Sequence, residues 1–144
     1  MTFKKLSDHY FVSPQITMDD IPAIVDAGFV TVICNRPDDE VPVSLQASMI
    51  RQVTEDAGLN FEALPVTHQT MTPEIIARQW ALADTSSGPV LAYCASGTRC
   101  SVIWALGAAT NQIPIRMILD KTRQAGYNLD NLHKTLVAAA KYAK

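Results

Sequence analysis

Residues 90–101 read Val90-Leu91-Ala92-Tyr93-Cys94-Ala95-Ser96-Gly97-Thr98-Arg99-Cys100-Ser101. The apolar run before Cys94 predicts a buried strand, the small residues after it predict a tight turn, and the apolar spacing from Arg99 onward is that of a helix. Backbone N–H groups and the positive end of a helix attract anions at such a junction. This stretch therefore predicts an anion-binding loop that begins with a cysteine.

Cys94 is the candidate nucleophile, and Arg99 is its candidate catalytic partner. The loop amides, the helix N-terminus and the guanidinium each favour a thiolate over a thiol. Cysteines in such surroundings have pKa values of roughly 4–7 instead of about 8.5, and the thiolate is the reactive form. The remaining members of the predicted anion-binding loop are Ala95, Ser96, Gly97, Thr98 and Ser101. Gly97 can adopt the positive φ that a tight turn requires.

A buried structural cysteine is the alternative interpretation of Cys94, because free cysteines are often buried. The Ser-Gly-Thr-Arg sequence that follows, and the helix after it, make the functional interpretation more specific than a cysteine alone would.

Working outward from the loop, strands alternate with helices along the chain. Apolar and β-branched runs predict strands, while capping residues and glycine stops predict the helices between them. Strands are predicted at 10–12, 29–33, 61–66 and 89–93, and helices after Thr17, after Ser44, after Thr72, from Arg99 to Ala109, near 115–125 and near 129–143. This order predicts a single α/β domain over residues 1–144, with a mainly parallel central sheet flanked by helices.

The composition excludes several classes of protein. The 144 residues are 48% hydrophobic and 18% charged, with a net charge of −2, so we expect no binding to nucleic acid or to an anionic membrane surface. The apolar run 102–109 is too short to span a bilayer, and the N-terminal residues lack the apolar core of a signal peptide. The sequence shows no metal-ligand cluster and no dinucleotide fingerprint, so we expect no metal and no cofactor.

Three cysteines without a regular framework do not indicate a secreted disulfide scaffold. We therefore expect a protein of a reducing compartment, the cytoplasm, whose thiols are free.

The loop Cys94–Ser101 resembles the signature loop shared by cysteine-based phosphatases and rhodaneses. Together with residues 12–16, 32–40 and 64–66, it makes nearly the whole chain similar to the bacterial family of beta-lactamase-hydrolase-like phosphatase-like proteins. The resemblance implies a fold like that of a dual-specificity phosphatase. It also implies one of two activities, because members are labelled phosphatases by fold, or sulfurtransferases where they occur beside persulfide-oxidising enzymes.

Two departures from the phosphatase pattern favour sulfur transfer. Four residues separate Cys94 from Arg99, where such phosphatases have five, and this rhodanese spacing predicts a smaller anion site. Residues 67–72 contain no Asp to protonate a leaving alcohol, a role worth about 10²–10⁴-fold, whereas a thiolate leaves more easily. His68 is a candidate replacement acid, although an ordinary polar loop residue is the simpler interpretation.

We therefore expect a sulfurtransferase in which Cys94 carries a persulfide held by the loop amides and Arg99. A phosphatase that forms a phosphocysteine is the alternative, and a thiol redox-sensing or anion-binding module is the third interpretation. The expected partner is a small anionic or thiol substrate, or a phosphorylated or persulfidated protein.

The other two cysteines are interpreted through the resemblance. It places Cys34 beside Cys94, where some phosphatases have a thiol that forms a protective disulfide, so Cys34 is either a resolving thiol or a small buried apolar residue. Cys100 stands where relatives have a Ser or Thr whose hydroxyl stabilises the thiolate. Packing is the simpler role for Cys100, and Ser101 is the adjacent hydroxyl. The resemblance also suggests an ion pair between Arg36 and Asp38 beside the pocket.

Overall fold

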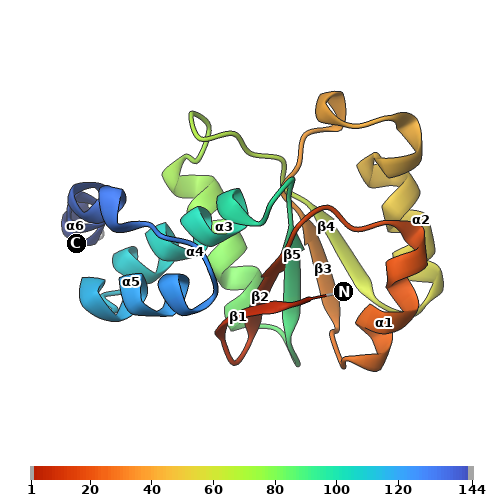
Figure 1. The fold of residues 1–144 in the computed structure, drawn as a ribbon, viewed down its shortest axis with the longest axis horizontal. Coiled ribbons are helices and arrows are strands. Elements are labelled where there is room, and N and C mark those ends of the chain that lie inside the picture. The colour runs from red at the N-terminus through yellow and green to blue at the C-terminus, as the bar shows by residue number, and fades with distance from the viewer. Residues whose placement is uncertain (1, 143–144) are drawn as a thin grey trace.

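A computed structural model describes residues 2–142, and its centre is a five-stranded sheet in the order β1-β2-β5-β3-β4 (Figure 1). The strands are β1 (Lys4–Ser7), β2 (Tyr10–Ser13), β3 (Thr31–Cys34), β4 (Asn60–Ala63) and β5 (Val90–Tyr93). Strand β1 pairs antiparallel with β2, and all other neighbours are parallel. The mainly parallel sheet predicted from the sequence is therefore confirmed.

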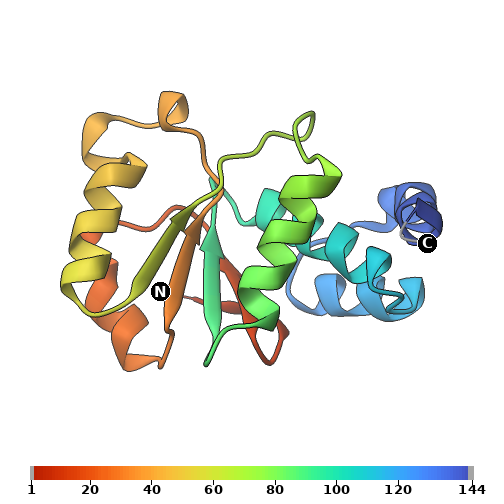
Figure 2. The same ribbon diagram turned by 180° about the vertical axis from the view of Figure 1, so that it is seen from behind.

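Helices cover both faces of this sheet (Figures 1 and 2). The helices are α1 (Ile21–Asp26), α2 (Ala47–Asp56), α3 (Pro73–Asp84), α4 (Thr98–Thr110), α5 (Ile115–Gln124) and α6 (His133–Tyr142). Helices α1 and α2 lie on one face and α3 and α4 on the other, while α5 and α6 pack against α4. Among the described residues, no helix is both long enough and apolar enough to cross a membrane.

The central strand β5 and the helix α4 that follows it form the interior of the domain. All four residues of β5 are buried, since β2 and β3 flank the strand and helices cover both of its faces. Nine residues of α4 are buried, because α3, α5 and α6 surround it. The strand and the helix that flank the cysteine loop are therefore held in place by the surrounding core.

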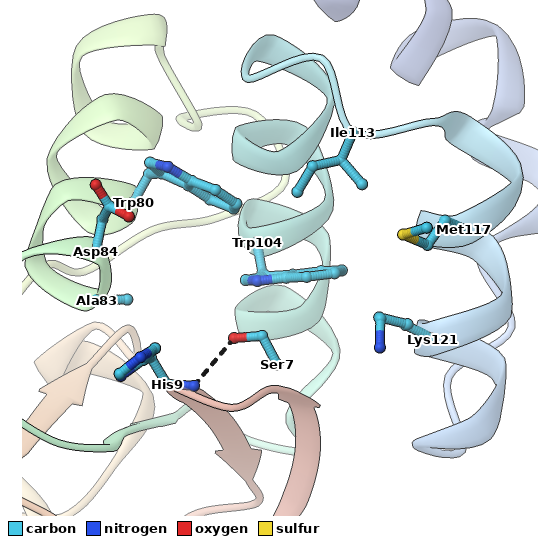
Figure 3. A pocket seen from close by; sticks show the side chains of 9 residues that line it. All are labelled: Ser7, His9, Trp80, Ala83, Asp84, Trp104, Ile113, Met117 and Lys121. Carbon is cyan, nitrogen blue, oxygen red and sulfur yellow. Dashed lines mark hydrogen bonds between the residues drawn. The ribbon is translucent and has the colours of Figure 1, made fainter.

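Trp80 on α3 and Trp104 on α4 pack against each other, with ring centroids 6.4 Å apart. They line an apolar pocket of about 230 Å³ between α3, α4, α5 and the β1–β2 hairpin (Figure 3). The rim of this pocket carries the polar side chains of His9, Asp84 and Lys121. We call this cavity, lined by Trp80 and Trp104, the tryptophan pocket.

Several local predictions were wrong. Strand β1 was not predicted, because only Leu6 of its four residues is buried and no alternation marks it. Ser44 does not begin α2 but lies in a 3₁₀ turn; α2 begins at Ala47, whose N–H donates to Asp38 Oδ1 at 2.8 Å. Strand β4 ends at Ala63, before the predicted limit of residue 66.

The first and last helices also begin later than predicted. A 3₁₀ turn, Met18–Asp20, separates Thr17 from α1. Another, Asp130–Leu132, precedes α6. The predicted end of the last helix, Ala143, lies outside the described residues.

Candidate active site

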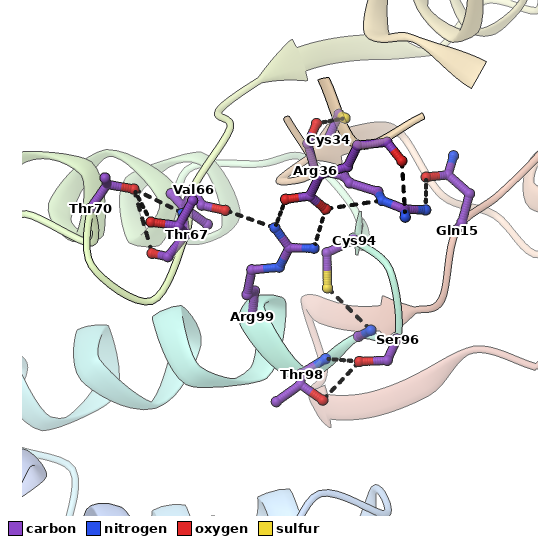
Figure 4. Close-up of polar contacts among 12 residues, drawn as sticks. Gln15, Cys34, Arg36, Val66, Thr67, Thr70, Cys94, Ser96, Thr98 and Arg99 are labelled. Carbon is purple, nitrogen blue, oxygen red and sulfur yellow. Dashed lines mark hydrogen bonds and ion pairs between the residues drawn. The ribbon is translucent and has the colours of Figure 1, made fainter. Parts of the chain in front are cut away.

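The loop after β5 lies at the carboxyl edge of the parallel sheet. Because parallel strands end at the same edge, the loops after β3, β4 and β5 converge there. The loop after β2 joins them through a hydrogen bond from Gln15 N–H to the carbonyl of Ala95, at 3.2 Å. Cys94 is the first residue beyond β5 and therefore lies where these loops meet (Figure 4).

Gly97 ends the loop and is the N-cap residue of α4. Its φ of 93° lies in the left-handed region, which glycine adopts without steric cost. The Tyr127 hydroxyl donates to the Ser96 carbonyl at 2.9 Å and occupies the space that a side chain on Gly97 would need. Both the conformation and the close approach of Tyr127 therefore require glycine at this position.

Hydrogen bonds to its sulfur stabilise Cys94 as a thiolate. The Gly97 N–H donates to Sγ at 3.1 Å. The neighbouring Cys100 thiol is the largest cause that lowers the pKa of Cys94, and the backbone N–H groups of Cys100, Gly97 and Ser96 add to it. Burial of the sulfur acts against them, yet the pKa of Cys94 falls to about 5. The sulfur is therefore predominantly anionic at neutral pH.

Of the two residues after Arg99, Cys100 and not Ser101 has the side chain that lowers the pKa of Cys94. Cys100 is fully buried, and burial raises the pKa of its thiol, so the thiol keeps the proton that it donates. The Ser101 hydroxyl instead donates to the carbonyl of Gly97 at 2.8 Å and is buried. The structure therefore does not bring Ser101 into the anion site.

The surface above the loop is an open pocket of about 390 Å³. Its wall consists of Glu40, Thr67, His68, Gln69, Ala95, Ser96, Thr98 and Arg99. The hydroxyls of Ser96 and Thr98 lie 2.9 Å apart. The Thr98 N–H donates to Ser96 Oγ at 3.3 Å, so this amide forms a hydrogen bond within the loop. His68 is exposed in the wall, on a segment that contributes no carboxylate.

Glu40 is the residue of this site that the sequence analysis missed. Its two carboxylate oxygens accept hydrogen bonds from Arg99 Nη1 at 2.8 Å and Nη2 at 2.7 Å, while Arg99 Nη1 also donates to the carbonyl of Val66 at 3.1 Å. This contact lowers the pKa of Glu40 and raises that of Arg99. The only local signal for Glu40 in the sequence is its four-residue spacing from Arg36.

The expected ion pair between Arg36 and Asp38 is wrong. Arg36 Nε pairs with Glu40 Oε1 at 3.2 Å, and Arg36 Nη1 donates to Gln15 at 3.2 Å (Figure 4). Asp38 instead accepts the hydrogen bond from the first N–H of α2. Glu40 and Asp38 therefore bind different parts of the structure: Glu40 pairs with the two arginines, and Asp38 binds the N-terminus of α2.

Cys34 ends β3 and packs with the core that faces α1 and α2, whereas Cys94 belongs to the core that faces α3 and α4. Its sulfur lies 3.4 Å from the Arg36 carbonyl, and burial raises the pKa of its thiol. All three cysteines are free in the structure. A disulfide between Cys34 and Cys94 stays a prediction.

A network of buried polar side chains forms a hydrogen bond to the first turn of α4. Asn35 and Gln79 exchange two amide hydrogen bonds of 2.7 and 2.8 Å, and Gln79 donates to the Tyr10 hydroxyl at 2.9 Å. The Tyr10 hydroxyl in turn donates to the carbonyl of Cys100 at 2.8 Å. Satisfied networks of this kind hold a buried backbone in one position, and here they fix the residue that supports the thiolate.

Comparisons with known proteins agree with this geometry. The family described as "Beta-lactamase hydrolase-like protein, phosphatase-like domain" matches residues 2–111. Beta-lactamase hydrolase-like proteins of Agrobacterium fabrum (strain C58) and Xylella fastidiosa (strain Temecula1) are each 30% identical, over 73% and 88% of this chain. The chain spans about a quarter of these relatives, 24% and 29% of their lengths.

Solved structures with the same fold are also similar to this chain. A Neisseria meningitidis protein, described as a candidate phosphatase, is 36% identical with a TM-score of 0.86, over 96% of this chain and 99% of its own. Tk-PTP in its active form shares the fold at 16% identity, with a TM-score of 0.74 over 97% of this chain and 96% of its own. The fold therefore is that of the cysteine phosphatases, and the chain belongs to the beta-lactamase hydrolase-like family as its phosphatase-like domain.

Proposed function

We propose that this domain hydrolyses phosphate monoesters through a phosphocysteine intermediate on Cys94. The observation that carries the proposal is the position of Cys94, whose sulfur accepts the Gly97 N–H at the N-terminus of α4, next to a pocket that contains Arg99. The lowered pKa of Cys94, about 5, supports it. Similarity to phosphatases supports this activity better than the sulfur transfer expected from the loop spacing. The expected substrate is a small phosphorylated compound or a phosphorylated protein, in a reducing compartment such as the cytoplasm.

The reaction has two displacement steps. Cys94 Sγ attacks phosphorus, so that an S–P bond forms while the bond from phosphorus to the ester oxygen breaks, and the leaving oxygen takes a proton from an acid in the pocket. Water then attacks phosphorus, the S–P bond breaks, and phosphate leaves as the thiolate is regenerated. Loop amides and Arg99 stabilise the charge on the phosphoryl oxygens in both steps.

We assign the proton donor to His68, because the segment that carries it faces the pocket and offers no carboxylate. The change His68→Asn should lower kcat on phenyl phosphate by about 100-fold or more, since that leaving group needs a proton. It should change kcat on p-nitrophenyl phosphate much less, because p-nitrophenolate leaves unaided. Gln69→Ala, a change at the neighbouring wall residue, is the matched control; equal losses on both esters would reject His68 as the acid.

Turnover assays on p-nitrophenyl phosphate and on a phosphotyrosine peptide test the proposed function directly. Wild type should release inorganic phosphate from both, and Cys94→Ser from neither. Activity on the aryl ester alone, at the same rate in both proteins, would end the proposal.

Sulfur transfer is the second candidate, and the four residues between Cys94 and Arg99 are the feature that favours it. Incubation with glutathione persulfide followed by intact-mass measurement separates the two activities. A sulfurtransferase should gain one sulfur on Cys94 and lose it to an added thiol. A phosphatase should show turnover of phosphate esters without this stable gain.

A further inference from the structure

Two backbone carbonyls of the cysteine loop, residues 94–97, are bound from outside the loop. The carbonyl of Ala95 accepts a hydrogen bond from the Gln15 N–H at 3.2 Å, and the carbonyl of Ser96 accepts one from the Tyr127 hydroxyl at 2.9 Å. The first donor is a backbone group, which any residue except proline would provide. The second is a side chain, so this contact depends on the identity of one residue.

Each of these carbonyls shares a peptide group with an N–H that lowers the pKa of Cys94. In a trans peptide group the C=O and the N–H point in opposite directions, so a carbonyl that is held outward aims its N–H inward. The Ser96–Gly97 group shows this directly. Tyr127 binds its carbonyl, and its N–H donates to Cys94 Sγ at 3.1 Å. Tyr127 and the sulfur therefore bind opposite ends of one peptide group.

The Tyr127 hydroxyl also strengthens the Gly97 N–H as a donor. Hydrogen bonds in a chain polarise one another, so a bond to the carbonyl increases the partial positive charge on the N–H of the same peptide group. A more positive N–H stabilises the charged form of the Cys94 sulfur. Burial raises the pKa of the Tyr127 hydroxyl, so the hydroxyl keeps the proton that it donates.

The backbone at Tyr127 is held in the turn that follows α5. The Tyr127 N–H donates to the carbonyl of Thr122 at 2.8 Å. Within the same region Arg123 pairs with Asp130 at 2.6 Å, which ties the end of α5 to the segment beyond the turn. Tyr127 lies outside residues 2–111, the part of the chain that matches the family model. The hydroxyl therefore reaches the loop from a segment beyond that part.

We propose that Tyr127 is a positioning residue for the nucleophile: its hydroxyl holds the Ser96–Gly97 peptide group with the N–H aimed at Cys94. It acts through this peptide group and not on the reacting atoms. The inference rests on the proposed function only in taking Cys94 as the nucleophile. Loss of the hydroxyl should let the carbonyl turn and weaken the Gly97 N–H as a donor, so that the thiolate forms at higher pH.

Alkylation of Cys94 by iodoacetamide, followed by mass spectrometry from pH 4 to 9, tests the proposal on Tyr127→Phe, which keeps the aromatic ring. The matched control is Tyr142→Phe, which removes the hydroxyl of an exposed tyrosine on α6. The pH of half-maximal alkylation should rise by about half a unit in Tyr127→Phe. It should match wild type in Tyr142→Phe.

Amide resonances of the ¹⁵N-labelled protein show which donor has changed. In Tyr127→Phe the Gly97 N–H proton should move upfield, because its hydrogen bond is weaker. The Thr98 N–H, which donates to Ser96 Oγ at 3.3 Å, should keep its position. Equal movement of both amides would mean that the loop rearranges as a whole, and would overturn the specific role of this peptide group.

The remaining outcomes separate this inference from the proposed function. An alkylation curve of Tyr127→Phe that coincides with those of wild type and Tyr142→Phe would overturn the positioning role and leave the phosphatase proposal intact. The expected shift in a protein that hydrolyses no phosphate ester would refute the phosphatase and keep the positioning role. A wild-type Cys94 that is alkylated with the pKa of a free thiol, about 8.5, would overturn both.

Discussion

At the scale of the single residue, the lowered pKa of Cys94 depends more on Cys100 and the loop amides than on the arginine that marks the motif. The largest contribution to its lowered pKa comes from the Cys100 thiol, followed on the favourable side by backbone amides. A buried thiol is suited to this role, because burial raises its pKa and so favours the protonated form that can donate.

Replacing Cys100 should therefore change the titration of Cys94. We expect Cys100→Ala to raise the Cys94 pKa by about one unit or more, and Cys100→Ser to keep it near the wild-type value, since a hydroxyl also donates. The rate of Cys94 alkylation by iodoacetamide, followed by mass spectrometry from pH 4 to 9, measures this value. Cys34→Ser serves as a control for the loss of a thiol, and a Cys100→Ala curve that coincides with it would remove Cys100 from this role.

At the scale of the element, the junction between β5 and α4 is built around a glycine that a tyrosine covers. Tyr127 follows α5, and its hydroxyl donates a hydrogen bond to the Ser96 carbonyl of the loop. Gly28 has nearly the same φ, 92°, but an added Cβ there would meet no atom within 4 Å. A comparison of the two positions therefore separates the free-energy cost of a positive φ from that of the steric clash with Tyr127.

Gly97→Ala should destabilise the protein by more than Gly28→Ala. Both changes place alanine at a positive φ, which costs roughly 1 kcal/mol, and only the first adds the collision with Tyr127. Urea unfolding measures the difference, and the double change Gly97→Ala with Tyr127→Phe should recover part of it. Equal losses in the two single variants would show that Tyr127 does not restrict this position.

The sequence predicted the parts of the site that are local in the chain. Residues 90–109 show a buried strand, a small-residue turn and a helix in consecutive order, so Cys94, Gly97 and Arg99 could be found from pattern alone. Glu40 lies 59 positions from Arg99, and Tyr127 lies 31 from Ser96, so only the fold brings them together. Cys100 was visible, but its role depends on its depth, which no local pattern encodes.

At the scale of the whole molecule, the thiolate makes stability depend on pH. The folded pKa of Cys94 is about 5, whereas an unfolded cysteine titrates near about 8.5, so the unfolded chain binds more protons between these values. The stabilisation from this group is therefore fully present above about pH 8.5 and is lost as the pH falls through 5.

The free energy of unfolding of wild type, minus that of Cys94→Ser, should accordingly grow as the pH rises from 5 to 8.5. Urea titrations of both proteins under reducing conditions give this difference. Subtracting the variant removes the contributions of the titrating groups that do not interact with Cys94. A difference that stays constant across the range would mean that Cys94 titrates alike in the folded and unfolded chains.

The tryptophan pocket has a practical consequence for studying this domain. Trp80 and Trp104 are the only two tryptophans in the sequence, and both stand at the contact between α3 and α4. Tryptophan fluorescence from the unlabelled protein thus comes from one small region, the contact between α3 and α4. A change in the wavelength or intensity of this fluorescence, during catalysis or unfolding, therefore reports a change at the contact between the two helices without an added label.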